Sequence, residues 1–309
     1  MEVHYGLDQI HIAAPVATIG SFDGLHLGHM QVLEGLKRCA REWEGETVII
    51  TFEPHPREVL FPMEKRPGIL TALNEKIEIL ESYGIDHLII IKFTEALAAM
   101  SYGDFVRNIL VDKIGIKALV IGYDHRLGKD REGNFDVLKV LAQQYHFELK
   151  QEQVYTEDEI NVSSTKIRTA LELGEIQVVN KLLGYDYKIS GEVVHGDRIG
   201  RSIGFPTANI KVNDERKLFP ATGVYVVKVK IDDQEYGGMV NIGVRPTVSK
   251  AGIIRPEVNI FDFDGDLYGQ CLTLSFIARI RGERRFDNTE ELRLQLQQDF
   301  KQAQEILAN

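Results

Sequence analysis

The first half of the chain alternates short, wholly apolar runs with stretches of helical periodicity, and this alternation limits the possible folds most strongly. The runs are typical of buried strands, which we expect at residues 16–19, 47–52, 88–93, 118–122 and 148–154. Strands that are apolar throughout and alternate with helices indicate a parallel sheet covered on both faces. The sequence therefore predicts a doubly wound α/β domain.

Apolar residues between these strands recur with a period near 3.6, which predicts amphipathic helices. Residues 71–84 place Leu73, Ile77 and Leu80 on one face. Residues 102–114 form a second such helix, and Ser101 and Asp104 are spaced as in a capping box before it.

The pattern changes near Gly184, after which strands are separated by turns instead of helices. The expected strands are residues 187–194, 224–231, 235–242, 257–261 and 272–280. Successive strands with few helices indicate an antiparallel sheet or a small barrel. One amphipathic helix ends the chain, with Thr289 as its expected cap and an apolar stripe of Leu292, Leu296, Phe300 and Ile306. We therefore predict two domains, residues 1–184 and residues 185–309.

Charge and cysteine usage exclude several classes of protein. The net charge is −10, of which residues 1–184 carry −9 and residues 185–309 carry −1, so neither half has the basic excess that binding to nucleic acid needs. No apolar run approaches the roughly 20 residues that span a bilayer. The only cysteines, Cys39 and Cys271, form no CxxC pair, so we expect no disulfide framework or structural zinc cluster. A reducing cytosol, without a secretory signal or membrane partner, fits this composition. The oligomeric state is not indicated.

The segment Gly20-Ser-Phe-Asp-Gly-Leu-His-Leu-Gly-His29 directly follows the first of these expected strands and leads into a helix. Its three glycines allow a phosphate chain to approach the backbone. His26 and His29 are three residues apart, so on a helical turn they face the same anion at the helix N-terminus. Imidazoles there can stabilise charge on a phosphate. Two alternatives stay open: metal ligation, for which no third ligand is evident, and ordinary residues at a helix start.

The N-terminal half resembles the adenylyl- and cytidylyltransferase superfamily through His26-Leu-Gly-His29, and its bacterial FAD synthetase branch through the longer motif. Three later segments agree in order: Thr51-Phe-Glu-Pro-His-Pro56, Gly122-Tyr-Asp124 and Ser163-Ser-Thr-Lys-Ile-Arg168. The resemblance implies a Rossmann-like nucleotidyltransferase domain that binds FMN and ATP. The implied ligand-binding residues are Gly20, Phe22, Asp23, Gly24, Gly28, His55, Asp124, Ser163, Ser164 and Thr165.

The motif at residues 163–168 can also be interpreted from its residues alone, without the resemblance. Ser163 and Ser164 stand where a helix starts, so their hydroxyls and the unpaired N–H groups make an anion site. Lys166 and Arg168 then clamp the phosphates of ATP. The alternative is a capped surface helix with two solvated cations.

Gly196, Gly200 and Gly204 recur every four residues, which predicts a loop because a helix tolerates such spacing poorly. A glycine-rich loop between strands suits a phosphate. Thr207 offers a hydroxyl and Asn209 an amide oxygen, which are hard ligands of the kind that Mg²⁺ accepts. The alternative is an ordinary glycine loop.

The segment from Gly191 to Asn209 resembles the riboflavin kinase signature, which ends in Pro-Thr-Ala-Asn. The resemblance implies a small antiparallel β-barrel of riboflavin kinase type with a terminal helix, and it implies binding roles for Gly191, Gly196, Gly204, Pro206 and Arg245. It also implies that Glu257 is the general base, which takes the proton from the ribityl 5′-hydroxyl. The alternative for Glu257 is an ordinary surface glutamate. Asn259 stands where relatives commonly have His, and we expect it to change local hydrogen bonding.

The two resemblances cover nearly the whole chain and imply a bifunctional enzyme of flavin cofactor biosynthesis. The C-terminal half then phosphorylates riboflavin to FMN with ATP. The N-terminal half adenylylates FMN to FAD and releases pyrophosphate, with Mg²⁺ serving both steps. Two alternatives remain: a nucleotidyltransferase for another phosphorylated acceptor, and a non-catalytic flavin-binding regulator.

Overall fold

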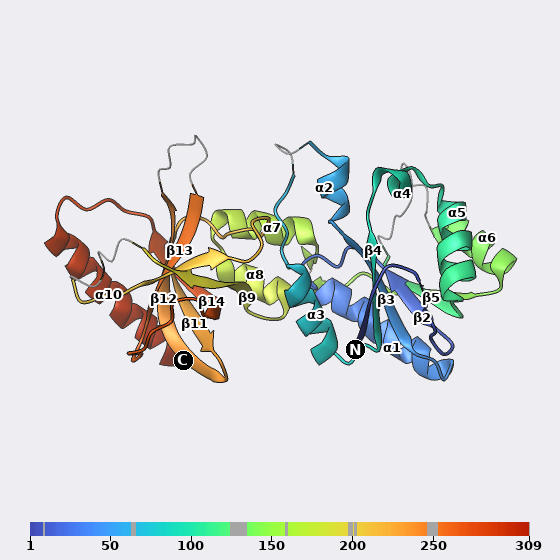
Figure 1. The fold of residues 1–309 in the computed structure, drawn as a ribbon, viewed down its shortest axis with the longest axis horizontal. Helices are drawn as coiled ribbons and strands as arrows, with labels where there is room; N and C mark the ends of the chain where they lie inside the picture. Colours follow the sequence, from blue (N-terminus) through green and yellow to red (C-terminus); the bar gives the residue numbers. More distant parts are fainter. Residues whose placement is uncertain are drawn as a thin grey trace. The chain divides into compact units, whose positions relative to one another are not determined.

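A computed structural model of the chain describes residues 1–8, 10–62, 66–123, 135–157, 160–196, 200, 203–245 and 253–308. The chain separates into two compact units, Met1–Ser164 and Thr165–Asn309 (Figure 1). Each unit contains a main sheet of its own.

The first unit is built on a six-stranded parallel sheet in the order β1-β4-β3-β2-β5-β6. Its strands are β1 (Glu2–Tyr5), β2 (Val16–Ile19), β3 (Thr47–Glu53), β4 (His87–Lys92), β5 (Ala118–Ile121) and β6 (Glu148–Gln151). All five predicted strands are present. The edge strand β1 was not predicted, because it has only four residues and lacks an apolar run. The strand order reverses at β2, and the carboxyl end of β2 is therefore the expected ligand position.

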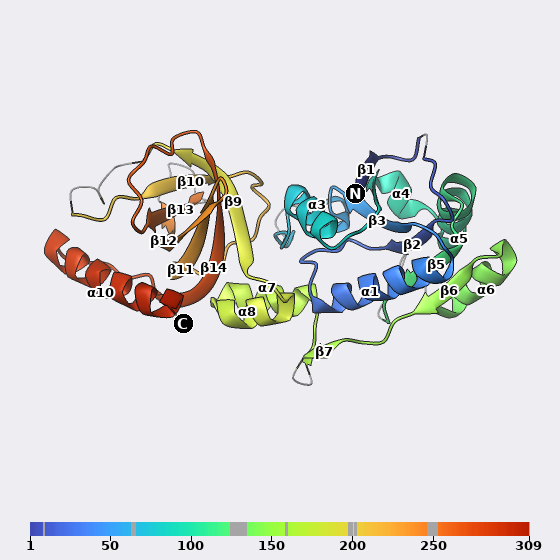
Figure 2. The same cartoon turned by 90° about the horizontal axis from the view of Figure 1, so that it is seen from below.

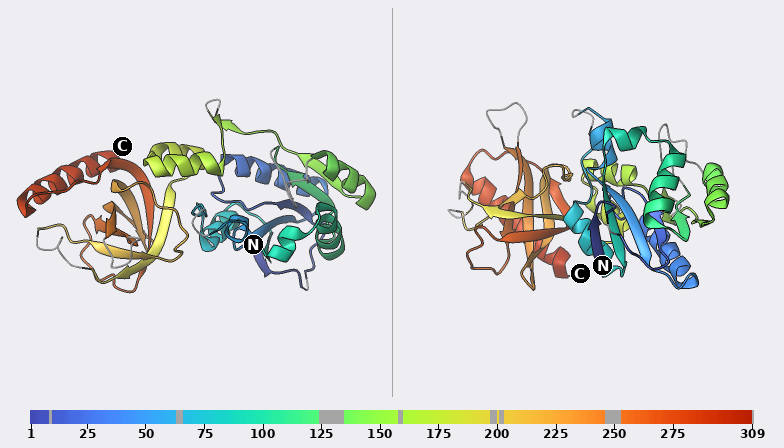
Figure 3. Two further views of the ribbon diagram at one scale, coloured as in Figure 1. Left: turned by 90° about the horizontal axis from the view of Figure 1, so that it is seen from above. Right: turned by 45° about the vertical axis from the view of Figure 1, so that its right-hand side comes forward.

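Helices cover both faces of this sheet, as the alternating pattern predicts. The core on one face includes residues of α1 (Leu27–Glu42) and α3 (Leu73–Ser82). The core on the other face includes residues of α5 (Tyr102–Phe105), η2 (Val106–Ile114) and α6 (Phe135–Tyr145); α5 and α6 lie side by side (Figures 1 and 3). Ser101 caps α5, accepting a hydrogen bond from the Asp104 N–H at 3.1 Å. The remaining short elements are α2 (Pro56–Leu60), α4 (Glu95–Ala99), β7 (Thr156–Glu157) and β8 (Ile160–Asn161).

The second unit contains a closed, six-stranded antiparallel barrel in the order β10-β13-β12-β11-β14-β9. The strands are β9 (Tyr187–Val194), β10 (Ala208–Val212), β11 (Gly223–Ile231), β12 (Gln234–Arg245), β13 (Ile253–Ile260) and β14 (Cys271–Gly282). Strand β10 was not predicted, because its first residues end the glycine-rich segment that we interpreted as a loop. It pairs with both β9 and β13, and so it closes the barrel.

Within the described ranges, the barrel is accompanied by helices α7 (Ser164–Leu173), α8 (Ile176–Leu183) and α10 (Thr289–Ala308). Helix α10 lies along the outside of the barrel (Figure 2), and its Phe300 ring packs edge-on against Phe261 at 4.6 Å between centroids. The expected cap of α10 is wrong by one residue. Asn288, and not Thr289, accepts the Glu291 N–H at 2.9 Å, because the helix begins one residue after the capping side chain. Among the described residues, no helix has the length and apolarity needed to cross a membrane.

Candidate functional site

Hydrogen bonds to the segment that precedes α3 fix the loop between β2 and α1. Asp23 is 2% exposed, and its Oδ1 accepts the N–H groups of Leu70 at 2.8 Å and Thr71 at 3.1 Å. The Gly24 N–H donates to Thr71 Oγ1 at 3.0 Å. These bonds use three backbone donors, with the Asp23 carboxylate and the Thr71 hydroxyl as acceptors, so they hold the loop in place at the carboxyl end of β2.

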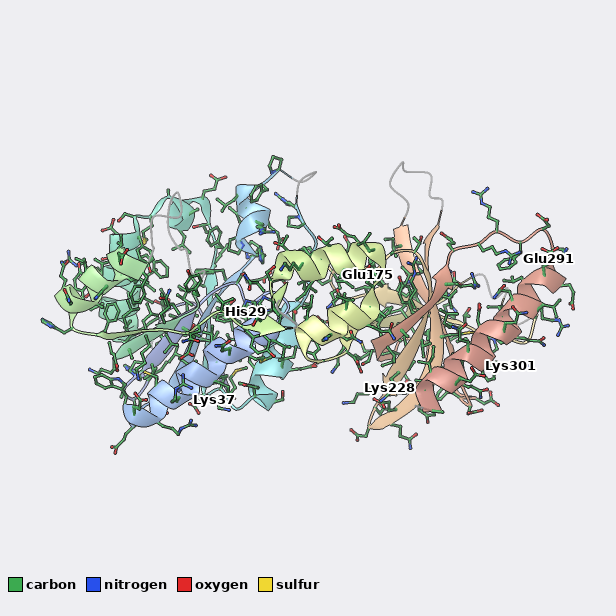
Figure 4. The ribbon with its side chains drawn as sticks, turned by 180° about the vertical axis from the view of Figure 1, so that it is seen from behind. His29, Lys37, Glu175, Lys228, Glu291 and Lys301 are labelled. Carbon is green, nitrogen blue, oxygen red and sulfur yellow. The ribbon has the colours of Figure 1, made fainter. Side chains whose placement is uncertain are left out.

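His26 and His29 form a stacked pair at the start of α1; His29 is labelled in Figure 4. Their ring centroids are 3.7 Å apart and the rings are tilted by only 13°. His26 is the N-cap of the helix, and its Nδ1 accepts the His29 N–H at 3.3 Å. Because Nδ1 is an acceptor here, the proton of neutral His26 is on Nε2. The predicted sharing of one face by the two imidazoles is therefore confirmed.

His29 is held in its neutral form. The pKa of His29 is lowered well below its ordinary value of 6.5, mainly because the ring is buried away from water. The neighbouring His26 and the Lys76 ammonium lower it further. Its Nδ1 is buried and has no hydrogen-bond partner within the described part of the chain. A neutral, stacked imidazole can donate or accept a hydrogen bond at a helix N-terminus, where an anion is favoured.

Two glycines allow this packing. A Cβ at Gly28 would lie 3.2 Å from the His26 ring, and a Cβ at Gly20 would lie 3.3 Å from the ring of Phe22. Phe22 in turn contacts the edge of His29, with ring centroids 5.3 Å apart. The motif's glycines thus make room for its aromatic rings, a requirement that the sequence pattern alone did not reveal.

Lys76 of α3 is a site residue that the sequence analysis missed. The side chain is 5% exposed, and its Nζ donates to the Ser21 carbonyl at 2.7 Å and to Thr51 Oγ1 at 3.4 Å. A signal was available, since Lys76 follows Leu73 by three residues and precedes Leu80 by four, on the face that we expected to be buried. A buried cation beside the His26–His29 motif adds fixed positive charge to the region.

Replacing Lys76 with methionine should destabilise the chain by about 1–3 kcal/mol, because the partly buried Ser21 carbonyl loses a charged donor. Urea unfolding measures this change. The matched control is Lys92→Met, since Lys92 is exposed at the end of β4 and surface substitutions usually change stability by less than about 0.5 kcal/mol. Equal destabilisation by both substitutions would contradict the structural role of Lys76.

The remaining predicted residues of the N-terminal half are distributed over several elements. His55 caps α2, and its Nδ1 accepts the Arg57 N–H at 3.1 Å. Ser163 precedes α7, and Ser164 Oγ donates to the Asp23 carbonyl at 2.8 Å, which joins this motif to the β2–α1 loop. Within α7, Thr165 and Lys166 are exposed, Arg168 is buried, and Ile167 and Leu171 form the predicted buried face. Asp124 lies outside the described residues.

A row of polar side chains crosses the barrel on adjacent strands. Glu257 of β13 pairs with Asn209 of β10 on one side and with Asn241 of β12 on the other. Directly paired residues share a face of the sheet. The next residue, Val258, is completely buried, so the row lies on the opposite, outer face. Glu257 is half-buried, and the register places an asparagine beside it on each neighbouring strand.

The glycine-rich segment packs against Thr207 and Asn209. A Cβ at Gly196 would lie 2.1 Å from the Asn209 amide nitrogen, and a Cβ at Gly200 would lie 2.2 Å from the Phe205 carbonyl and 3.5 Å from Thr207 Oγ1. The hydroxyl and amide oxygens are hard donors of the type that binds Mg²⁺. Thr207 and Asn209 therefore fit a divalent cation. Because Gly196 and Gly200 lack side chains, nothing from these two positions overlaps the Thr207 and Asn209 side chains.

Substituting alanine for Gly196 should lower the riboflavin phosphorylation that the sequence resemblance implies at least about tenfold, because the added methyl group would overlap the Asn209 side chain and displace it. Steady-state kinetics with riboflavin and ATP measures the effect. Gly103→Ala is the matched control, because a Cβ there meets no atom within 4 Å. An unchanged rate in Gly196→Ala would show that Asn209 need not keep its position.

The four other predicted residues of this half lie in β9, in the segment before β10 and at the end of β12. Gly191 lies in β9, where a Cβ would meet the Lys211 carbonyl at 2.4 Å, so it permits close pairing with β10. Gly204 has a positive φ of 85°. The Pro206 carbonyl accepts a hydrogen bond from Asn259 Nδ2 at 2.7 Å, so Asn259 does enter local hydrogen bonding. Arg245 ends β12, and its side chain lies outside the described residues.

Each half of the chain matches a known protein family. The family model described as FAD synthetase matches residues 9–166, and the one described as riboflavin kinase matches residues 183–307. The chain is 38% identical over 304 residues to the bifunctional riboflavin kinase/FMN adenylyltransferase of Escherichia coli K12, covering 98% of this chain and 96% of that protein. The chain belongs to the bifunctional riboflavin kinase/FMN adenylyltransferase family.

Other relatives agree in length and order. The family member of Pseudomonas fluorescens is 39% identical over 95% of this chain and 93% of its own, and that of Bacillus subtilis is 36% identical over 96% and 94%. The crystal structure of the macrolide-efflux protein from Streptococcus pneumoniae matches with a TM-score of 0.89, at 30% identity and 98% coverage of both chains. The fold therefore extends over the full chain.

Proposed function

We propose that the chain carries out two consecutive ATP-dependent steps: it phosphorylates riboflavin to FMN and adenylylates FMN to FAD. The observation that carries the proposal is the order of the two family matches along one chain, each over its own fold. The first step yields ADP and the second yields pyrophosphate. Neither step requires a covalent intermediate with the enzyme.

In the kinase step, Glu257 acts as the general base. It takes the proton of the ribityl 5′-hydroxyl while the oxygen attacks the γ-phosphate of ATP. The strand register supports this role, because it places Glu257 on the outer face of the barrel with an asparagine, Asn209 or Asn241, on each neighbouring strand. Gly191, Gly196, Gly204, Pro206 and Arg245 belong to the flavin and nucleotide subsites in this proposal.

In the adenylyl transfer step, the FMN phosphate attacks the α-phosphate of ATP. His26 and His29 donate hydrogen bonds to the phosphate oxygens at the start of α1, and Lys166 and Arg168 bind the departing pyrophosphate. Two features support these roles: the imidazoles are stacked at a helix N-terminus, and Ser164 is hydrogen-bonded to the β2–α1 loop. The other proposed ligand-binding residues are Gly20, Phe22, Asp23, Gly24, Gly28, His55, Asp124, Ser163, Ser164 and Thr165.

The proposed catalytic domains are residues 1–184 and 185–309. Mg²⁺ is the proposed metal, held at Thr207 and Asn209 in the kinase domain, and when bound with ATP it neutralises phosphate oxygens. Riboflavin, FMN, FAD and ATP are the proposed small-molecule partners. The net charge disfavours nucleic acid, and the two cysteines without a CxxC pair favour a reducing cytosol.

One incubation tests the proposal: the purified chain with riboflavin, ATP and Mg²⁺, and flavins separated by chromatography over time. FMN that appears first and then declines as FAD accumulates supports both activities. FMN without FAD would limit the function to the kinase step. Flavin binding without any turnover would favour a non-catalytic flavin-binding protein.

A further inference from the structure

Two histidines meet at the amino edge of the parallel sheet in the first unit, far along the strands from the catalytic motif. His87 is the first residue of β4 and pairs in register with Glu2, the first residue of β1. His4 lies two residues further along β1. The amino ends of the strands are at the edge opposite to the β2–α1 loop, so the proposed phosphate chemistry does not explain this cluster.

The two imidazoles are arranged as a chelating pair. His4 Nε2 and His87 Nδ1 are 3.1 Å apart, and the rings are stacked with centroids at 5.3 Å. Two nitrogen ligands of a tetrahedral zinc ion lie about 3.4 Å apart, given Zn–N distances of about 2.0–2.1 Å. The observed separation therefore needs a change of only a few tenths of an ångström.

A carboxylate completes the set of ligands. Glu2 Oε2 lies 3.8 Å from His87 Nδ1, and Glu2 Oε1 lies 3.8 Å from His4 Nδ1. One ligand atom from each of Glu2, His4 and His87 can be chosen so that all three lie within 4.8 Å of one another. The Glu2 side chain is 67% exposed, so it can move toward an ion without disturbing the sheet.

A second carboxylate occupies the position of an outer-sphere partner. Glu46 Oε2 lies 3.4 Å from His87 Nε2, the nitrogen that faces away from His4, and it also accepts the Ala13 N–H at 2.8 Å. Metal-bound histidines usually donate their other ring N–H to such a carboxylate, which fixes the tautomer. With protons on His87 Nε2 and His4 Nδ1, both inward nitrogens present lone pairs to an ion.

We propose that Glu2, His4 and His87 form a binding site for one divalent transition-metal ion, with Zn²⁺ as the best fit to two imidazoles and one carboxylate. Without metal, one of the two inward nitrogens donates a hydrogen bond to the other. On binding, the donating ring changes tautomer, so that its proton lies on its outward nitrogen and both inward nitrogens can bind the ion. Water fills the fourth position. The ion cross-links β1, an edge strand of four residues, to β4.

A second cluster, Cys39, Glu42 and Glu148, has a comparable spacing but suits a cation less well. The Lys150 ammonium already forms an ion pair with Glu42 and lies 3.6 Å from Glu148. A resident positive charge competes with a metal ion. This cluster therefore supplies a control and not a second proposal.

The test is a Zn²⁺ titration of the full chain without an affinity tag, after treatment with a chelator and its removal, in competition with a chromophoric chelator. We expect one Zn²⁺ per chain. His4→Gln and Glu2→Gln should each weaken binding at least about tenfold, and Glu46→Gln by about 10–100-fold. Co²⁺ titration should give visible absorption bands of a low-symmetry site that His4→Gln abolishes.

Two variants control for non-specific binding. His146→Asn removes an exposed histidine at a positive φ of 59°, a conformation that Asn tolerates, and Cys39→Ser alters the competing cluster. Both should bind Zn²⁺ like the parent chain, and far-UV circular dichroism checks that every variant is folded. Failure of the parent chain to bind Zn²⁺, or parental affinity in folded His4→Gln, would overturn the proposal.

Discussion

Glu257→Gln is expected to lower kcat for riboflavin phosphorylation by about 10²–10⁴-fold, the usual contribution of a general base. Glutamine keeps the shape of the side chain but cannot accept the ribityl proton. It has nearly the same size and lies on the outer face of the barrel, where its backbone pairs with Asn209 and Asn241, so the barrel should remain intact. The measurement is initial-rate kinetics with riboflavin, and separately with FMN, as substrate.

The second substrate makes this prediction specific. Conversion of FMN to FAD should be unchanged in Glu257→Gln, because the proposed adenylyl transfer site lies in the other domain. Glu192→Gln is the matched control, since Glu192 is an exposed glutamate on strand β9 of the same barrel. Loss of both activities to the same extent, or loss of phosphorylation in the control, would contradict a general-base role for Glu257.

The fold was predicted correctly where burial of an element leaves a clear apolar pattern in its sequence. Strands β2 to β6 and the strands β9 and β11 to β14 carry apolar runs or alternation, and they lie where expected. Strand β1 is half-exposed and short, so its residues carry little pattern. Strand β10 begins directly after glycines, whose spacing correctly indicated a loop but gave no sign of where that loop ended.

The site prediction had a different limit. Motif spacing identified His26 and His29 as neighbours, because three residues separate positions on one helical face. It could not show that Asp23 bonds to the backbone of Leu70 and Thr71, because those residues are 47 and 48 positions away. The burial of Lys76 depends in the same way on tertiary contacts with Ser21 and Thr51.

His29→Ala is expected to lower FMN adenylylation by about 10²–10³-fold, the cost of removing one positioned donor from a developing charge. Riboflavin phosphorylation should keep its rate, which is the reverse of the Glu257→Gln result. Alanine removes two things: the hydrogen-bond donor of the imidazole, and the ring whose centroid lies 3.7 Å from that of His26. His29→Asn separates them, because it restores a donor without the aromatic face, and His146→Asn controls for loss of a histidine elsewhere.

The pH dependence of stability provides a second readout for His29. Its pKa in the folded chain is lowered well below 6.5, so below that pH the unfolded chain binds a proton at His29 that the folded chain does not. The free energy of unfolding of the parent chain therefore falls as the pH drops below 6.5, and His29→Ala lacks this contribution. The stability difference between parent and variant should shrink from pH 7.5 to pH 5.5 in urea unfolding. A constant difference would mean that His29 titrates equally in both states, and it would count against a neutral imidazole held at the start of α1.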